Sequence, residues 1–234
     1  MSKQLALSLN NVGTFYWRQA GYLRKERFWA LKDVSFDLHY GESLGVIGRN
    51  GAGKSTLLQV LAGILRPDRG KMINHGVQAA LLSLQIGFVP YLTGRQNALL
   101  SGMLIGLHRK NVIEKMEDIQ DFSELGDFFD QPISTYSSGM KARLGFSVAF
   151  QLDPDVLLID EVLGVGDSDF QRKSSAVMHE KIRSDKTIVL VSHSVETIRQ
   201  LCDRAVWIEE GVSCAYGDTT DVLSLYEQQI KTKS

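Results

Sequence analysis

The stretch GVIGRNGAGKSTLLQVLAG, residues 45–63, constrains the fold of this chain more than any other part of the sequence. It begins as a buried strand would, passes through closely spaced glycines into a helical pattern, and matches G-x-x-x-x-G-K-[ST]. Glycines in such a turn let consecutive backbone N–H groups curl around an anion, and the helix that follows points its positive dipole end at the same place. An ordinary glycine-rich turn is the alternative, but the flanking strand and helix favour a phosphate-binding loop.

The side chains in this turn predict a bound triphosphate. Lys54 is expected to reach the β and γ phosphates, and the Ser55 hydroxyl is expected to be a ligand of Mg²⁺. The full set of expected contacts is Gly48, Arg49, Asn50, Gly51, Ala52, Gly53, Lys54, Ser55 and Thr56.

Two later segments supply acidic and imidazole groups at the ends of apolar runs. VLLIDE places Asp160, a second expected Mg²⁺ ligand, at the end of a buried strand, and Glu161 next to it could polarise an attacking water. TIVLVSHS places His193 just beyond another buried strand, where its imidazole could hydrogen-bond the γ phosphate. Each group alone has an ordinary structural explanation, so its meaning depends on the set.

Composition limits the alternatives. The chain has 234 residues, 44% of them apolar, which is enough for one domain with a sizeable core. Its 26 basic and 27 acidic residues leave a net charge of −1, so nucleic acid is not an expected partner. Cys202 and Cys214 have neither disulfide density nor zinc-site spacing, which predicts reduced thiols in a cytosolic protein. The apolar run at the start is too short for a signal peptide, and no stretch is long enough for a membrane span.

The order of patterns predicts an α/β protein. ESLGVIG, VLLID and TIVLVS read as strands buried on both faces, which is typical of a mostly parallel sheet, whereas residues 5–12 and 32–38 alternate like half-buried strands. Residues 95–150 are largely helical in pattern and form an inserted block. Residues 17–29 are predicted to be a loop rich in aromatic and basic residues. This loop could contact phospholipid heads, an anionic lipid-linked glycan or a partner protein, although a solvated hairpin with local packing is the more common case.

Four motifs, GRNGAGKST, YSSGMKAR, VLLIDE and VSHS, occur in an order and spacing that resemble the nucleotide-binding subunit of ABC transporters across essentially the whole chain. The resemblance implies an α/β P-loop NTPase fold, the ABC nucleotide-binding domain, with a RecA-like core, an inserted helical subdomain and an antiparallel β part. One domain over residues 1–234 is expected, with core segments at 1–90 and 151–234 and a helical subdomain at about 91–150.

The second motif implies a dimer. In the family this stretch is the signature motif, which completes the ATP site of the opposite subunit, so Ser137, Ser138 and Gly139 are expected to contact ATP in trans. The usual signature is Leu-Ser-Gly-Gly-Gln, and here Tyr136, Ser138 and Met140 replace its first, third and fifth residues. This variant resembles the branch that exports capsule, O-antigen and teichoic-acid chains. The segments FWALKDVSFDL, AALLSLQIGFVPYLTGRQN and EVLGVGDSDFQ resemble the same branch.

The resemblance also assigns roles to single residues. Tyr16 stands where the family stacks an aromatic ring on adenine, and Gly166 and Asp167 correspond to the loop that communicates across the dimer. Gln85 lies near the position of the glutamine that contacts Mg²⁺, but the polysaccharide branch often lacks a standard glutamine loop. Glu161 and His193 are the expected catalytic residues. ATP and Mg²⁺ are the expected ligands.

These inferences predict an ATPase that drives export of a lipid-linked cell-surface polysaccharide. A second copy of the chain, a multi-span permease and the glycan cargo are the expected partners, and the expected location is the cytoplasmic face of the inner membrane. The permease is expected to dock at residues 85–110. The chain stops without room for the carbohydrate-binding domain that some exporters carry, so no glycan recognition of its own is expected. Export of a drug or of a lipid without sugar, and a soluble ATPase acting on nucleic acid, remain as alternatives.

Overall fold

The computed structural model describes residues 4–19, 24–82, 87–105, 107–152, 154–160 and 167–233. Its strands are β1 (Leu5–Gln19), β2 (Lys25–His39), β3 (Ser43–Ile47), β4 (Arg69–Asn74), β5 (Ala79–Leu82), β6 (Val156–Asp160), β7 (Thr187–Val191), β8 (Arg204–Glu209) and β9 (Val212–Asp218). Its α-helices are α1 (Lys54–Leu61), α2 (Gly94–Leu104), α3 (Arg109–Glu114), α4 (Met116–Ser123), α5 (Ser138–Gln151), α6 (Ser168–Ile182), α7 (Val195–Leu201) and α8 (Thr219–Lys233). Two 3-10 turns, η1 (Gly126–Asp130) and η2 (Ile133–Thr135), lead into α5.

The described strands form one sheet in the order β4-β1-β2-β9-β8-β3-β7-β6-β5. Strands β8, β3, β7, β6 and β5 are parallel to their neighbours within this run, whereas β4, β1 and β2 pair antiparallel. The predicted strands ESLGVIG, VLLID and TIVLVS correspond to β3, β6 and β7. Their unbroken apolar runs are buried on both faces, because alternate residues point into two different cores.

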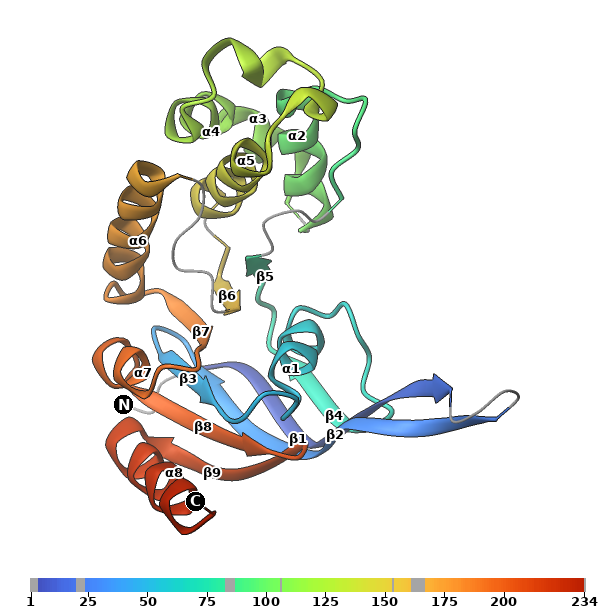
Figure 1. The fold of residues 1–234 in the computed structure, drawn as a ribbon, viewed down its shortest axis with the longest axis vertical. Coiled ribbons are helices and arrows are strands. Elements are labelled where there is room, and N and C mark those ends of the chain that lie inside the picture. The colour runs from blue at the N-terminus through green and yellow to red at the C-terminus, as the bar shows by residue number, and fades with distance from the viewer. Residues whose placement is uncertain are drawn as a thin grey trace.

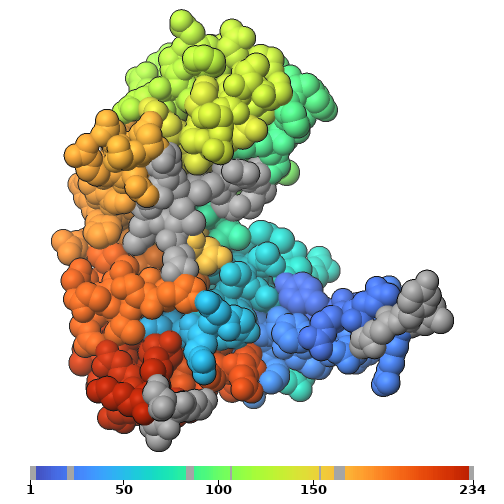
Figure 2. All heavy atoms as spheres, in the orientation of Figure 1, coloured from blue at the N-terminus to red at the C-terminus, as the bar shows by residue number. Residues whose placement is uncertain are grey.

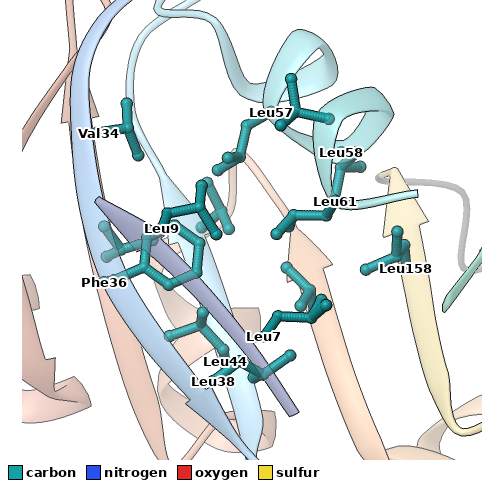
Figure 3. Packing of buried hydrophobic residues seen from close by; sticks show 14 of the residues in the cluster. Leu7, Leu9, Val34, Phe36, Leu38, Leu44, Leu57, Leu58, Leu61 and Leu158 are labelled. Atoms are coloured by element: carbon teal, nitrogen blue, oxygen red, sulfur yellow. The ribbon is translucent and has the colours of Figure 1, made fainter. Parts of the chain in front are cut away.

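Helix α1 covers one face of the sheet (Figure 1). Its leucines Leu57, Leu58 and Leu61 pack with apolar residues of β1, β2, β3 and β6 (Figure 3). The opposite face, represented by Leu157 and Ile159 of β6, packs against α5, α6, α7 and α8. Helix α1, which follows the phosphate loop, is therefore held against the sheet by its apolar side chains. Its first turn lies at the edge of the sheet.

The segment between β5 and β6 folds into helices with a core of its own. Buried residues of α2, α3, α4, the two 3-10 turns and α5 form this third cluster, and Ala98, Ile119 and Leu144 are among its fully buried members. Within residues 95–150, predicted to be largely helical, the stretch VIEKMEDIQDF is divided at Lys115 between α3 and α4. Figure 1 shows these helices standing above the sheet, and Figure 2 shows the surface hollowed between them and the part that carries β1, β2 and α1.

The prediction of a loop at residues 17–29 is wrong. Strand β1 continues to Gln19 and β2 begins at Lys25, so Tyr16 lies within a strand. The two strands pair in register from Phe15–Trp29 to Gln19–Lys25. Aromatic side chains favour strands and pack across them, and here that preference outweighs the charged residues that suggested a loop. Figure 1 shows this hairpin projecting from the rest of the molecule.

Within the described part of the chain, the structure holds no helix with the length and apolar character needed to cross a membrane.

Candidate functional site

Three neighbouring parallel strands bring the predicted site residues to one edge of the sheet. Strand β7 lies between β3 and β6, and Val191 pairs with Val46 on one side and with Asp160 on the other. Asp160 and the first residues of the loops after β3 and β7 therefore lie next to one another at the carboxyl ends of the three strands. Ligands of open parallel sheets bind beyond this carboxyl edge.

The glycines of the phosphate loop are required by close backbone approaches. A Cβ atom on Gly48 would lie 2.0 Å from the carbonyl oxygen of Ile208, and one on Gly53 would lie 2.4 Å from that of Ala30. Gly53 also has a φ of 106°, in the left-handed region, and stands at the N-cap of α1 without a side chain to cap the helix. The first backbone N–H groups of a helix have no intrahelical acceptor, so this turn presents donors to an anion.

Lys54 is held inside the loop that it follows. Its side chain is buried, and its Nζ donates to the carbonyl oxygens of Gly48 at 2.8 Å and Arg49 at 3.1 Å. The ammonium charge therefore lies within the curve of backbone N–H donors. A phosphate placed there would meet both a full positive charge and the helix dipole.

These groups border an open cleft of about 560 Å³. Its lining comes from the phosphate loop, the carboxyl edge of the sheet and the β1–β2 hairpin: Tyr16, Phe28, Ala30, Asn50, Gly51, Gly53, Lys54, Ser55, Thr56, Asp160 and His193. The structure thus brings together six of the nine predicted phosphate contacts, the predicted Mg²⁺ ligands Ser55 and Asp160, and the predicted histidine, whereas Gly48, Arg49 and Ala52 do not line this cleft. The hydroxyl of Ser55 and the carboxylate of Asp160 are hard oxygen donors, which fit Mg²⁺.

Two aromatic side chains form the outer part of the cleft. Tyr16 is 40% exposed, and its Oη lies 3.4 Å from Thr56 Oγ1 and donates to Gln59 Oε1 at 3.3 Å. Phe28 is the direct cross-strand partner of Tyr16 and lines the same cleft, and the Arg18 guanidinium lies over its ring. Sequence reasoning proposed Tyr16 but missed Phe28 as a cleft residue, because it treated residues 17–29 as a loop. Counting positions across a continuous hairpin would have found it.

The predicted trans contacts lie on the helical part of the chain and do not line this cleft. Ser137 is the N-cap of α5, and its Oγ accepts a hydrogen bond from the N–H of Met140 at 3.1 Å. The hydroxyl proton of Ser137 can still be donated to another acceptor. Ser138 and Gly139 form the first turn of α5, and Ser137 and Ser138 are exposed. The stretch thus presents hydroxyls and a helix N-terminus away from the chain's own phosphate loop.

Arg143, on the second turn of α5, connects this helix to the core. Its guanidinium contacts Asp167 Oδ2 at 3.1 Å and Glu124 Oε2 at 2.7 Å. Asp167 caps α6 by accepting from the N–H of Phe170, and that bond lowers the pKa of the Asp167 carboxyl. Glu124 also pairs with Lys173 of α6 at 2.6 Å. These ion pairs join the helical part to the beginning of α6.

Three predicted residues cannot be placed in this geometry. Glu161, Gln85 and Gly166 lie outside the described residues.

The fold and the site define the class of protein: an α/β P-loop protein whose phosphate loop, acidic strand end and histidine share one cleft. Comparison with protein families matches residues 31–164 to the family described as ABC transporter. The chain belongs to the ABC transporter family and is an ATPase, as the sequence predicted.

The relatives agree with this assignment. The O-antigen export system ATP-binding protein RfbB of Klebsiella pneumoniae is 47% identical over 206 residues, which cover 88% of this chain and 84% of that protein. The teichoic acids export ATP-binding protein TagH of Lactococcus lactis subsp. lactis is 45% identical over 87% of this chain, which corresponds to 44% of its own length.

Solved structures confirm the predicted fold. The structure of an ATP-binding subunit of an ABC transporter aligns with a TM-score of 0.73 and 24% identity, covering 95% of this chain and 93% of that one. A dimeric ATP-binding cassette bound to ADP and Pi after hydrolysis aligns with a TM-score of 0.70 and 22% identity, covering 91% and 98% of the two chains.

Proposed function

We propose that this chain is the ATP-hydrolysing subunit of an ABC transporter that exports a lipid-linked cell-surface polysaccharide. The observation that carries the proposal is the 47% identity with an O-antigen export ATP-binding protein across 84% of that relative's length. The similarity to a teichoic acids export ATP-binding protein points to the same class of cargo. In this proposal the chain is peripheral, at the cytoplasmic face of the inner membrane, where a permease subunit holds it.

The working unit in this proposal is a homodimer with two ATP molecules between its subunits. The support is the separation of the two halves of the site within one chain, since Ser137, Ser138 and Gly139 do not line the cleft that holds Lys54. The signature helix of one subunit would present the Ser137 hydroxyl and its N-terminal N–H groups to a triphosphate on the partner's phosphate loop. Bound ATP then contributes much of the interface energy, and hydrolysis removes that contribution.

The roles proposed for Lys54, His193, Ser55 and Asp160 are supported by their places around the cleft, and the role proposed for Glu161 rests on the sequence alone. Lys54 exchanges its two backbone acceptors for phosphate oxygens, and His193 donates to the γ phosphate from the end of β7. Ser55 and Asp160 would hold Mg²⁺, which when bound neutralises charge on the β and γ phosphates. Glu161, the residue after Asp160, orients the attacking water in this proposal.

Base recognition gives a test that separates the aromatic residues from the phosphate site. We expect Tyr16→Ala and Phe28→Ala each to weaken ATP binding by about tenfold, because loss of a stacked aromatic costs roughly 1–3 kcal/mol per base. Binding of inorganic tripolyphosphate, which has no base, should not change. Leu225→Ala, at a 50% exposed position on α8, is the control. Equal weakening of both ligands would show that the aromatic residues act by shaping the phosphate loop.

A second surface fits the permease. An apolar groove of about 200 Å³ lies between the end of α1, β5, α2 and α5, and Phe88, Leu104 and Val148 are among its lining residues. Ile64 and Leu104, at its border, are 56% and 58% exposed. Such an exposed apolar groove is the kind of surface into which an amphipathic helix of a partner protein binds. It falls in and beside the segment 85–110 that the sequence indicated.

The proposed export function is tested by comparing the surface polymer of cells that carry this chain, cells that lack it and cells that carry a variant of it. We expect Leu104→Asp to retain the ATPase activity of the isolated chain but to lose co-purification with the permease, because binding of the permease would bury the new carboxylate without a partner. Lipid-linked polysaccharide should then accumulate inside the cell. Leu225→Asp, at a leucine of α8 that is 50% exposed, should behave as wild type. Normal surface polymer in a strain lacking this chain would contradict the glycan cargo and favour export of a drug or another lipid.

A further inference from the structure

Hydrogen bonds connect the turn that follows Phe88, a residue of the apolar groove, with the residues that precede the signature stretch. The first part of this connection is the turn at residues 89–93, which is organised by Asn97, a side chain with no exposed surface. Asn97 Nδ2 donates to the carbonyl oxygens of Val89, Leu92 and Thr93 at 3.1, 3.0 and 2.9 Å, and its Oδ1 accepts from the N–H of Val89 at 2.7 Å. The two Nδ2 hydrogens are shared among three carbonyl oxygens and Oδ1 accepts a fourth bond, so this buried amide holds the turn in place.

The second part is the pairing of this turn with the residues that lead into the signature. Ser134 N donates to Pro90 O and Ile133 N donates to Leu92 O, both at 2.9 Å, and Gly94 N donates to Gln131 O at 3.2 Å. Segments 90–94 and 131–134 therefore behave as a short two-stranded strap. It ends two residues before the signature begins at Tyr136.

The third part is Tyr136 itself, where this chain differs from the usual signature by having a tyrosine in place of leucine. The ring is buried, and its hydroxyl donates to the carbonyl oxygen of Phe128 at 2.5 Å. A Cβ atom on Gly94 would lie only 2.2 Å from the Tyr136 Oη and 2.9 Å from the Phe129 carbonyl oxygen. The tyrosine hydroxyl therefore occupies a space that exists because the first residue of α2 is glycine.

Helix α2 completes the connection. It starts at Gly94, where Tyr136 is seated, and its last residue, Leu104, lines the groove together with Phe88. Eleven residues make a rod of about 16 Å, which moves as a unit because its ends cannot shift independently. A displacement of α2 at the groove must therefore reach the residue that precedes Ser137.

We propose that Tyr136 is a positioning residue, which sets the orientation of Ser137 and the start of α5 by holding the signature stretch against Phe128 and Gly94. The permease, through α2, would thereby control how well the signature meets the ATP of the partner subunit. This inference rests on the proposed function, because it assumes that Ser137 acts in trans. It gives the tyrosine that replaces the usual leucine a purpose that leucine, without a hydroxyl, does not serve.

The test uses Tyr136→Phe, which removes the hydroxyl and keeps the buried ring. The chain offers a matched control in Tyr216, whose hydroxyl likewise donates to a backbone carbonyl, that of Asp37, on the β2–β9 side of the sheet. Burial raises the pKa of both phenols to about 12, so both are protonated donors at neutral pH. The two phenylalanine variants lose the same kind of bond, and only one loses it beside the signature.

In the isolated chain, we expect Tyr136→Phe to lower ATP turnover by about tenfold, because small misplacements of a positioning group carry costs of that order. The affinity of the monomer for ATP should not change, since the hydroxyl lies outside the cleft. Tyr216→Phe should keep wild-type turnover, even if it lowers the thermal stability of the chain as much as Tyr136→Phe does. Equal turnover in the two variants would overturn the inference, and so would a loss of ATP affinity in Tyr136→Phe alone.

A double-mutant cycle tests the contact between Gly94 and the Tyr136 hydroxyl. Gly94→Ala should lower turnover, because its methyl group collides with the Tyr136 hydroxyl and crowds the Phe129 carbonyl oxygen, and Tyr136→Leu, which relieves the first collision, should cost less turnover in the Gly94→Ala chain than in the wild-type chain. Additive effects of the two changes would contradict a direct contact between them. Lys54→Ala in the same assay separates the proposed ATPase function from the proposed positioning role of Tyr136. If it abolishes turnover while the Tyr136 and Gly94 variants do not change it, only the present inference fails.

Discussion

Replacement of Lys54 by alanine is expected to reduce the ATP turnover of the chain by about 100- to 1,000-fold, the usual cost of removing one fixed group that stabilises developing charge. Lys54 is buried within the phosphate loop, where its Nζ donates to the carbonyl oxygens of Gly48 and Arg49. Among the described residues that line the cleft, Lys54 is the one lysine or arginine. Steady-state phosphate release by the purified chain measures the effect.

The controls for Lys54→Ala separate chemistry from folding. Lys110→Ala removes a lysine whose side chain is 86% exposed on α3, and its turnover should match wild type. Thermal unfolding should show that Lys54→Ala remains folded, because the leucines of α1 that fix the helix are untouched. Turnover within a few-fold of wild type, in a folded Lys54→Ala protein, would refute the assignment of the cleft as the ATP site.

The second large effect is a restoration of activity by mixing two inactive proteins. Lys54→Ala and Ser137→Ala should each be nearly inactive alone, because both sites of either homodimer carry one lesion. In an equal mixture, half of the dimers would contain one copy of each. Every mixed dimer has one intact site, formed by the normal phosphate loop of one copy and the normal signature of the other. About a quarter of the wild-type sites would then be active, if the copies exchange freely and the sites act independently.

The same mixture distinguishes the trans arrangement from a site contained in one chain. A site contained in one chain gives no recovery, since each polypeptide still carries its own lesion. A mixture of Lys54→Ala with Asp160→Asn should also stay inactive, because both of these residues belong to the same cleft. Recovery in that control, or failure to recover in the first mixture with dimers present, would disprove the trans arrangement.

The location of the phosphate edge could be predicted from sequence because it depends on local chemistry. Gly48, Lys54 and Asp160 each stand at a fixed offset from a buried apolar run, and parallel strands place their carboxyl ends together whatever their order. The order itself, with β7 between β3 and β6, is a long-range property that no local pattern states. Local patterns left open which motifs act on the same ATP. The resemblance to the ABC transporter family indicated that the signature motif completes the site of the opposite subunit.

Contacts between distant segments could not be predicted in this way. Phe28 reaches the cleft because β1 and β2 stay paired far beyond residues 5–12 and 32–38, whose alternating pattern predicted the two strands. Gly94 is a helix-starting glycine in the sequence, and only the fold shows that its missing side chain makes room for the hydroxyl of Tyr136. Arg143 likewise looks like an ordinary helix surface residue until α5 is placed beside Asp167.

The position of the signature serines outside the cleft of their own chain has a consequence for stoichiometry. Under the proposed trans arrangement, a chain with one phosphate loop and one signature can complete sites only with another chain. A two-fold pair closes with both halves of both sites used. A head-to-tail pair would leave an empty phosphate loop at one end and an unused signature at the other, ready to recruit more chains. Closure by symmetry therefore limits the assembly to two nucleotides and gives it no growing end.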